Sequence, residues 1–261
     1  MSSSTAPVAV PQEPQISRHR LHLPSVPEAF ASLLRTIVVA LFLLTFLLQP
    51  YLIPSESMEH TLLVGDFVLV NKQVYAPPGW LSRWIMPYHE IARGDIVVFH
   101  HPAPPFLVKR VVGIPGDRLR IEDGRVTVNG QALDEPYAAF EPTAYDPFRE
   151  EFPAKVYTDP EVDRIWWEQM QSLTRNGELV VPAGEYFVLG DNRNHSKDSR
   201  FWGFVPRAQI VARPLVIYFS LRRPSTTDVQ QAADDRLGHD RELSAKLTGF
   251  ARWKRIFLVV H

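Results

Sequence analysis

The chain has 261 residues, enough for one or two domains, and 45% of them are hydrophobic, which is ample for a core. The formal net charge of -1 argues against a nucleic-acid-binding protein, because such proteins usually carry a clear basic excess. The absence of cysteine excludes a disulfide framework, a thiolate zinc site and a cysteine nucleophile.

The N-terminal part predicts a membrane anchor. Residues 1–30 are rich in Ser, Pro and Ala and predict a flexible tail, whereas residues 31–53 carry no charge after Arg35. The second stretch has about the ~20 residues that a bilayer requires. Arginines precede it and acidic residues follow it, so the positive-inside rule places the N-terminus in the cytoplasm and the body on the outer face.

The same residues also bear on two alternatives to an anchor. A cleaved secretory signal would end in small residues, but this run ends in Leu-Gln-Pro-Tyr. A buried core helix fits less well with Pro50 and with the polar tail that precedes the run. The lipid bilayer is therefore an expected partner.

The stretch PSESMEHTLLVGD, residues 54–66, presents two serines on a short loop directly after the apolar run. The hydroxyls of Ser55 and Ser57 could simply cap a turn. They could also attack a substrate, but a serine nucleophile needs a base that accepts its proton.

The body after the anchor predicts a mainly β fold, and 23 prolines against 13 glycines favour turns and extended segments over a helical bundle. Residues 118–130 alternate on both sides of Asp123-Gly124, which is a strong hairpin signal. Further strands are expected at 66–72, 95–99, 106–112, 185–189 and 210–219. We expect an antiparallel catalytic sheet built from residues 54–135 and 177–225.

Lys109 is a candidate for the base. On the strand 106–112, alternation places Leu107, Lys109 and Val111 on one face. Burial there would lower the pKa of the lysine from ~10.4 toward ~7–8, where it becomes a competent general base. The alternative is an edge-strand lysine that points at water. His60 is another potential base near Ser57, although no acidic residue is placed by sequence to orient it.

The remaining segments predict accessory structure. Residues 136–176 are irregular and rich in Pro and aromatics, and we expect an inserted smaller lobe with a short helix at 162–173. Trp80, Trp84 and Ile85 either enter the membrane interface or pack in the core. Residues 226–261 form a tail with helical spacing at 228–247; its last nine apolar and basic residues before His261 either lie on the membrane or, as we favour, pack on the core.

The segment GDNRNHSKDSRFWGFVP, residues 190–206, is dense in hydrogen-bonding groups. It is either a well-bonded surface loop or a scaffold that fixes a nearby active lysine. The pattern alone favours neither.

Taken together, four segments resemble bacterial type I signal peptidases, also called leader peptidases. They are PSESMEHTLLVGDFVLVNK, RGDIVVF, VKRVVGIPGD and GDNRNHSKDSRFWGFVP, and they occur in the family's order. The resemblance covers the anchor and nearly all of residues 50–220. Any one of the segments would be a weak signal, but together they are highly specific.

The resemblance implies a serine–lysine dyad. Ser57 is then the nucleophile, Lys109 is the general base, and the Ser55 hydroxyl joins the Ser57 backbone N–H in an oxyanion hole. It also implies an extended substrate with small residues at the first and third positions before the cut. The expected walls of its apolar pockets are Ile53, Pro54, Met58, Leu107 and Val108.

The resemblance implies supporting roles in the polar segment. Ser196 would orient the lysine, Asp198 and Arg200 would form an ion pair that holds the loop, and Asp191 would support it. The sequence departs from the family where His60 replaces the usual proline and where Asn194-His195 replaces a more common Asp-Asn or Asp-His. Neither change removes a catalytic group.

The expected protein is a single-pass serine endopeptidase of the cytoplasmic membrane that removes signal peptides from exported pre-proteins. No metal, cofactor, nucleic acid or obligate oligomer is expected. Three alternatives remain: a peptidase of this family with one dedicated substrate, a self-cleaving regulator that shares the serine–lysine β fold, and a non-catalytic membrane-anchored binding domain.

Overall fold

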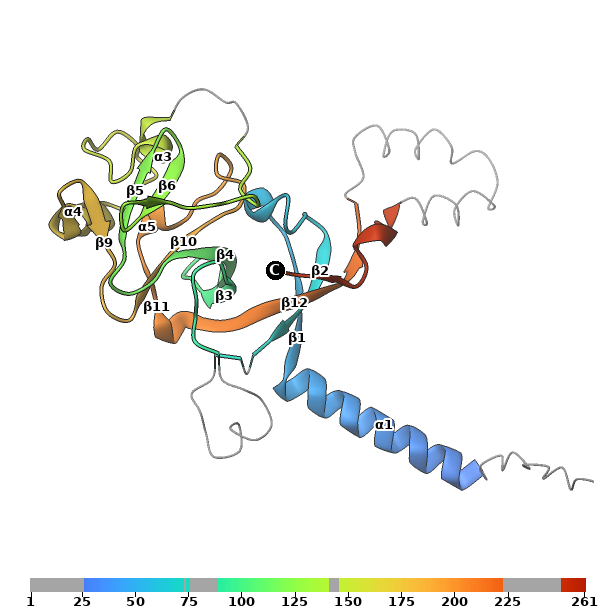
Figure 1. The fold of residues 1–261 in the computed structure, drawn as a ribbon. Coiled ribbons are helices and arrows are strands. Elements are labelled where there is room, and N and C mark those ends of the chain that lie inside the picture. The colour runs from blue at the N-terminus through green and yellow to red at the C-terminus, as the bar shows by residue number, and fades with distance from the viewer. Residues whose placement is uncertain (1–25, 73, 76–88, 141–145, 223–249) are drawn as a thin grey trace, which may run out of the picture. The chain divides into compact units, whose positions relative to one another are not determined.

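A computed structural model describes residues 26–72, 74–75, 89–140, 146–222 and 250–261 (Figure 1). The chain forms two compact units, Met1–Leu41 and Phe42–His261. The predicted membrane contacts of Trp80, Trp84 and Ile85 and the predicted helix at 228–247 lie outside the described residues.

Helix α1 (Val26–Phe46) contains most of the predicted anchor. Pro27 lies in its first turn, where the missing N–H would have no helical partner in any case. Its large apolar side chains are exposed, among them Leu33, Leu34, Ile37, Val38, Val39, Leu41 and Phe42. Within the part of the chain that the structure describes, no helix combines the length and the apolar character needed to cross a membrane.

The predicted span 31–53 is wrong at its C-terminal end. The helix ends at Phe46, and β1 (Leu48–Leu52) follows and pairs antiparallel with β2 (Asp66–Asn71). Pro50 sits opposite Leu69 in this pair, and β1 is the outer strand of its sheet. An edge strand tolerates proline because one side of it needs no ladder hydrogen bond.

The main sheet is antiparallel, as predicted, and has the strand order β1-β2-β12-β3-β4-β10-β11, with β13 paired to β12. Its long strand β12 joins the half that contains β1 and β2 to the half that contains β3, β4 and β10 (Figure 1). The bounds of the strands not yet given are β3 (Ile96–His100), β4 (Phe106–Gly113), β10 (Glu185–Leu189), β11 (Val205–Pro206), β12 (Ile210–Ser220) and β13 (Leu258–Val259).

A second antiparallel sheet has the order β7-β6-β5-β9-β8. Its predicted hairpin turns at Asp123-Gly124, where both residues have positive φ as a tight two-residue turn requires. Its strands are β5 (Arg118–Glu122), β6 (Arg125–Val128), β7 (Gln131–Ala132), β8 (Thr174–Arg175) and β9 (Glu178–Val180). The smaller sheet therefore takes strands from both sides of the segment 136–176 and, with β8, from its end. The predicted division is wrong here, because β5, β6, β7 and β9 were expected in the catalytic sheet and not in a smaller lobe.

The helix predicted at 162–173 is α4 (Arg164–Leu173), which begins after Asp163 caps the N–H of Trp166. Trp166 and Met170 of α4 are buried in one core cluster with the second sheet. The other helices are short: α3 (Pro147–Glu150), α5 (Ser199–Trp202), and the 3-10 turns η1 (Glu56–Met58), η2 (Arg207–Gln209) and η4 (Trp253–Arg255).

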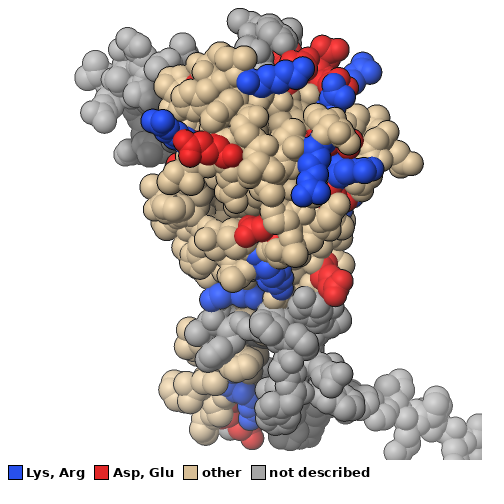
Figure 2. Space-filling view, turned by 90° about the vertical axis from the view of Figure 1, so that its left-hand side faces the viewer, with Lys and Arg blue, Asp and Glu red and all other residues tan. Residues whose placement is uncertain are grey.

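The C-terminal segment packs on the main sheet, as the sequence favoured. Its strand β13 pairs with β12, and Val260 is buried in the cluster that contains Met58 and Leu62. Phe257 and Leu258 remain exposed. On the face that Figure 2 shows, basic and acidic side chains lie interspersed among wider uncharged areas.

Candidate active site

Ser57 lies on the loop of residues 53–66 that joins β1 to β2. Two backbone hydrogen bonds close the base of this loop, from Ile53 N to Asp66 O at 2.9 Å and from Gly65 N to Ile53 O at 3.0 Å. Gly65 has a φ of +87°, and a Cβ there would stand 2.1 Å from the Leu221 carbonyl oxygen. Only glycine fits this crossing of two backbones.

Buried apolar side chains hold the loop on the sheet. Met58, next to Ser57, is 1% exposed, and Leu62 is fully buried. The Met58 carbonyl accepts hydrogen bonds from Thr61 N at 3.1 Å and Leu62 N at 2.8 Å. Ser57 is thereby fixed directly before an anchored side chain and a compact turn, and Ser57 itself is 8% exposed.

Lys109 lies on β4, between β3 and β10 in the interior of the main sheet. It is 2% exposed, so the alternative of a lysine that points at water does not apply. Burial lowers the pKa of Lys109 to about 8, against the opposing charge of Asp198. Its Nζ donates a hydrogen bond of 3.0 Å to Ser196 Oγ.

The polar loop after β10 surrounds this lysine. Asp198 is fully buried and accepts from Arg200 Nε and Nη2, each at 2.9 Å, and from Gly190 N at 3.1 Å. Burial alone would raise the pKa of Asp198, but the Arg200 guanidinium and its hydrogen bonds hold that pKa below its ordinary value. Asp198 therefore stays ionised close to Lys109, and its pair with Arg200 fixes the loop that carries Ser196.

Asp191 joins the polar loop to both reactive segments. It accepts two hydrogen bonds of 2.8 Å from Arg110, the residue after Lys109, and one of 2.5 Å from Thr61 on the serine loop. Arg110 and Asp191 are both buried. The neighbouring Asn192 N donates to the Ser57 carbonyl at 3.1 Å. One buried ion pair thus holds β4 and the serine loop against the same segment.

Gly190 is a residue of this site that the sequence analysis did not single out. A Cβ at Gly190 would stand 2.3 Å from Ser196 Oγ and 2.4 Å from the Ser57 carbonyl oxygen. Both distances are far below any real contact, so only glycine allows the two segments to approach. Its place at the end of the strand, directly before Asp191, was the only signal available.

Ser55 and Ser57 have their hydroxyl oxygens 3.4 Å apart. Within the described chain, the hydrogen bonds do not include one between Lys109 Nζ and Ser57 Oγ, and the lysine is engaged with Ser196 instead. His60 is exposed and has a φ of +81°. The described residues contain no cluster of His, Asp or Glu that could hold a metal ion.

A pocket of about 400 Å³ opens beside the two reactive side chains. Ser57 and Lys109 line it, and the five residues that the sequence analysis named as substrate walls, Ile53, Pro54, Met58, Leu107 and Val108, line it as well. A second pocket, of about 440 Å³, shares Pro54, Ser55, His195 and Lys197 with the first. The two pockets therefore adjoin each other at the start of the serine loop.

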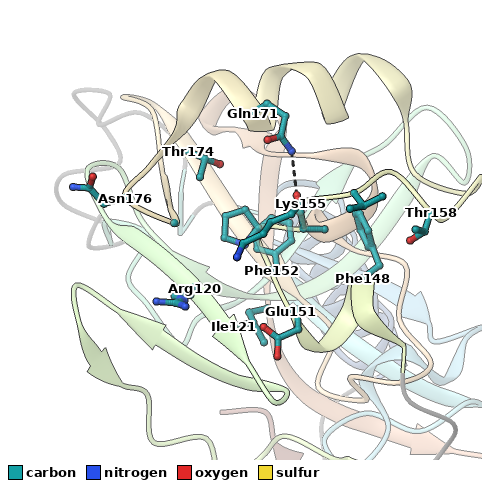
Figure 3. Close-up of a pocket in the computed structure, with 14 residues that line it drawn as sticks. Arg120, Ile121, Phe148, Glu151, Phe152, Lys155, Thr158, Gln171, Thr174 and Asn176 are labelled. Carbon is teal, nitrogen blue, oxygen red and sulfur yellow. Dashed lines mark hydrogen bonds between the residues drawn. The ribbon is translucent and has the colours of Figure 1, made fainter.

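A larger pocket, of about 650 Å³, lies between the second sheet and helix α4 (Figure 3). Gln171 reaches from α4 toward the segment after α3 and donates to the Ala154 carbonyl at 3.1 Å. None of the predicted site residues lines this pocket.

Comparison with known proteins supports the family resemblance that the sequence segments indicated. Residues 27–219 match the family described as "Signal peptidase, peptidase S26". Signal peptidase I of Aquifex aeolicus is 36% identical over 226 residues, which span 73% of this chain and 83% of the relative. Signal peptidase I of Pseudomonas fluorescens is 34% identical over 222 residues, spanning 77% of this chain and 75% of the relative. The crystal structure of a signal peptidase I from Enterococcus faecalis is 30% identical and covers 48% of this chain and 97% of its own, with a TM-score of 0.36.

Proposed function

The chain belongs to the bacterial type I signal peptidases of family S26, serine peptidases that remove signal peptides from exported proteins, and on that premise we propose that Ser57 and Lys109 are its catalytic dyad. The observation that carries this proposal is the buried Lys109, which faces the same pocket as Ser57 and has a pKa lowered to about 8. A lysine with this pKa is neutral in about a tenth of molecules at pH 7, far more than an ordinary lysine, and can accept a proton.

In the proposed reaction, neutral Lys109 takes the proton of the Ser57 hydroxyl, and Ser57 Oγ attacks the carbonyl carbon before the cleavage site. The Ser57 backbone N–H and the Ser55 hydroxyl stabilise the oxyanion, and removal of one such donor typically lowers the rate by roughly 10²–10³. The mature protein leaves as an amine that takes up the proton. Lys109 then activates a water molecule that hydrolyses the acyl-enzyme.

The side chains around the lysine have positioning roles in this proposal. Ser196 holds Nζ at 3.0 Å and limits the directions in which the amine can move. Asp198 and Arg200 fix the segment that carries Ser196, and Asp191 ties this segment to the serine loop. A neutral Lys109 amine can keep donating an N–H to Ser196 Oγ while its lone pair accepts the Ser57 proton, so the bond to Ser196 can orient the lone pair during the transfer.

We further propose that the substrate lies extended across the serine loop. The apolar pocket beside Ser57 suits small side chains before the cut, and its walls include Leu107 and Val108 of β4. An extended peptide beside such a strand gains backbone hydrogen bonds as well as side-chain contacts. The repertoire of pre-proteins, or a single dedicated pre-protein, is then decided by the fit of these small side chains.

The proposed location is the cytoplasmic membrane, with the N-terminus in the cytoplasm and the catalytic body outside. The support is the charge-free stretch after Arg35, the arginines that precede it and the exposed apolar side chains of α1. Only four residues separate β1, which follows α1, from Ser57. A cleavage site that emerges at the outer surface of the bilayer would then meet the nucleophile within a short distance along the chain.

The test is cleavage of a secretory precursor in detergent by the full chain and by Ser57→Ala, Lys109→Met and Lys109→His. Lys155→Met serves as the control, because Lys155 is exposed and lines the distant pocket of the second sheet. We expect the three site variants to lose cleavage while their thermal unfolding stays cooperative, and the control to keep it. Cleavage by Lys109→Met would show that the lysine is not the base.

A further inference from the structure

The C-terminal segment of residues 250–261 crosses the base of the serine loop, although it lies far from that loop in sequence. Its backbone pairs with the end of β12, where Arg252 N donates to the Ser220 carbonyl at 2.9 Å. Leu221 N in turn donates to the Gly65 carbonyl on the loop at 2.9 Å. Figure 1 shows this red segment beside the orange end of β12.

The segment brings two arginines to Asp66, a carboxylate that is fully buried. Arg255 Nη2 lies 2.6 Å from Asp66 Oδ2, and its Nε lies 3.2 Å from both carboxylate oxygens. Arg252 Nη2 is 3.5 Å from Oδ1, and the Ser220 hydroxyl donates to Oδ1 at 2.6 Å. Removal of a cation from a buried pair leaves an uncompensated charge, so Asp66 depends on this distant segment.

Asp66 is part of the serine loop rather than a separate feature. Its Oδ2 accepts from Leu63 N at 2.8 Å, and its backbone closes the loop against Ile53. The same Arg255 Nη2 donates to the Thr61 carbonyl at 2.9 Å. Arg255 therefore holds two points of the loop, the carboxylate at its base and a carbonyl four residues after Ser57.

The contact at Thr61 is connected to the nucleophile through Met58, the residue that follows Ser57. Thr61 N donates to the Met58 carbonyl, and the Thr61 hydroxyl donates to Asp191. Arg110, which binds Asp191, also donates to the His261 carbonyl at 3.2 Å. The turn that follows Ser57 is thus fixed on one side by the polar loop near Lys109 and on the other by the C-terminal segment.

We propose that Arg255 is a positioning residue for Ser57, and that residues 250–261 act as a clamp that sets the height of the serine loop above Lys109. The inference rests on the proposed role of Ser57 and Lys109 and assigns a function to a segment that carries no family motif. Among the described residues, the hydrogen bonds of Arg255 reach neither Ser57 nor Lys109, so Arg255 acts through Thr61 and Asp66.

The clamp matters because a serine nucleophile and its base must be held within about 0.5 Å of their productive geometry. Misplacement by about 1 Å can reduce the rate by about 10²-fold without removing a reacting group. Leu107 and Val108 on β4 do not depend on Arg255, whereas Ile53, Pro54 and Met58 lie on the serine loop itself. We therefore expect a smaller change in KM than in kcat.

The test compares the full-length Arg255→Ala and Lys254→Ala variants with wild type. Lys254 is the exposed neighbour on the same 3-10 turn, and within the described residues no hydrogen bond or ion pair joins it to the loop. We expect Arg255→Ala to lower kcat by about 10–10²-fold with KM within about twofold of wild type. Arg255→Lys should retain an intermediate kcat, because an ammonium can pair with Asp66 but cannot also span to the Thr61 carbonyl.

Two further readouts separate positioning from loss of fold. Millimolar guanidinium should restore part of the kcat of Arg255→Ala, whereas the same concentration of sodium chloride should not. Amide hydrogen exchange should accelerate in peptides from residues 53–66 and stay unchanged in those from the second sheet. The exchange measurement does not need a cleavage reaction, so it tests the clamp even if Ser57 and Lys109 prove not to be the dyad.

The proposal is overturned if Arg255→Ala has wild-type kcat. It is also overturned if the lost activity only follows the unfolded fraction, with the folded molecules fully active, or if exchange in residues 53–66 does not change. Absence of cleavage by wild type, with faster exchange in Arg255→Ala, would instead contradict the proposed dyad and leave the clamp standing.

Discussion

At the scale of single residues, the protonation of Lys109 is predicted to set the pH dependence of cleavage. Burial lowers its pKa to about 8, so the amine carries a proton below that pH and cannot accept another. We expect kcat/KM to rise about tenfold per pH unit below pH 8 and to level off above it. The measurement is the pH profile of kcat/KM with a short precursor peptide. An inflection near pH 6.5 would indicate a histidine instead. His195→Gln would then test the histidine that lines the same pocket, and His60→Gln the one nearest to Ser57 in sequence.

Gly190 supports a second prediction at this scale. A methyl group at this position would overlap Ser196 Oγ and the Ser57 carbonyl, so Gly190→Ala must push the lysine's hydrogen-bond partner or the serine loop out of place. We expect kcat to fall by about 10²-fold or more while the fold is retained, because a displacement of about 1 Å is sufficient. The measurement pairs steady-state kinetics with thermal unfolding.

Wild-type kinetics of Gly190→Ala would show that the two segments can separate without consequence. A matched control is Gly177→Ala, which also replaces a glycine but has no atom within 4 Å of the added Cβ. Gly177 has a positive φ, which Gly190 lacks, so Gly177→Ala should lose some stability through backbone strain but should keep wild-type kcat.

The residue scale also shows where sequence reasoning reaches its limit. The spacing of Lys109 on its strand left open whether it faces water, and the family motifs selected it. Gly190 and Arg255 carried no comparable signal, because their importance lies in how closely two distant segments approach. The distance between two backbone segments that meet only after folding cannot be inferred from the local spacing of residues.

At the scale of elements, the turn after Ser57 predicts how His60 affects stability. Met58 O accepts from Thr61 N, Glu59 has a φ of -55°, and His60 has a φ of +81°, which describes a turn that favours glycine at its third position. We expect His60→Gly to raise the free energy of unfolding by about 0.5–1 kcal/mol, because a left-handed residue other than glycine costs roughly 1–2 kcal/mol. The measurement is denaturant unfolding at fixed pH.

The geometry of the same turn predicts the opposite effect on stability for proline at this position. His60→Pro should destabilise the protein, because proline fixes φ near -65° and cannot adopt the observed positive value. Equal stability of the glycine and proline variants would contradict the turn geometry. Unchanged kcat in His60→Gly would also exclude His60 as the base.

Strands were predictable from alternation wherever one face is buried. The hairpin at Asp123-Gly124 and the strands around Lys109 match the expected positions, because local pattern and tertiary burial agree there. Strand β1 was missed, because Leu48–Leu52 continues an apolar run and reads as the end of a helix. Pro50 was the available signal, since proline disfavours a helix interior and is tolerated on an edge strand.

At the scale of the whole molecule, the assembly of the two sheets could not be read from the sequence. The second sheet combines the hairpin β5–β6 with β9, which lies beyond the segment 136–176. The C-terminal segment contacts the serine loop although the two are far apart in sequence, and no local pattern predicts this contact. Such pairings depend on loop closure between distant parts of the chain, whereas propensity and periodicity report only neighbours.

The membrane anchor is the remaining prediction at this scale. If the stretch that contains α1 lies in the bilayer, charges placed in it should release the chain, because an arginine near the middle of a bilayer helix costs about 2.5–3.5 kcal/mol. We expect wild type to stay in the membrane pellet after alkaline carbonate washing and Val38→Arg with Leu41→Arg to move to the supernatant. Both residues are more than half exposed on α1, so the substitutions disturb no packing within the helix.

The matched control places the same two charges on exposed apolar residues of the catalytic body, Val156→Arg with Ile165→Arg. This variant should remain in the pellet, because those positions are not expected to enter lipid. If both double variants remain in the pellet, the stretch that contains α1 is not the anchor and another part of the chain holds the membrane. If wild type itself is extracted by carbonate, attachment is peripheral, and cleavage at the bilayer surface must then rely on the substrate's own membrane segment.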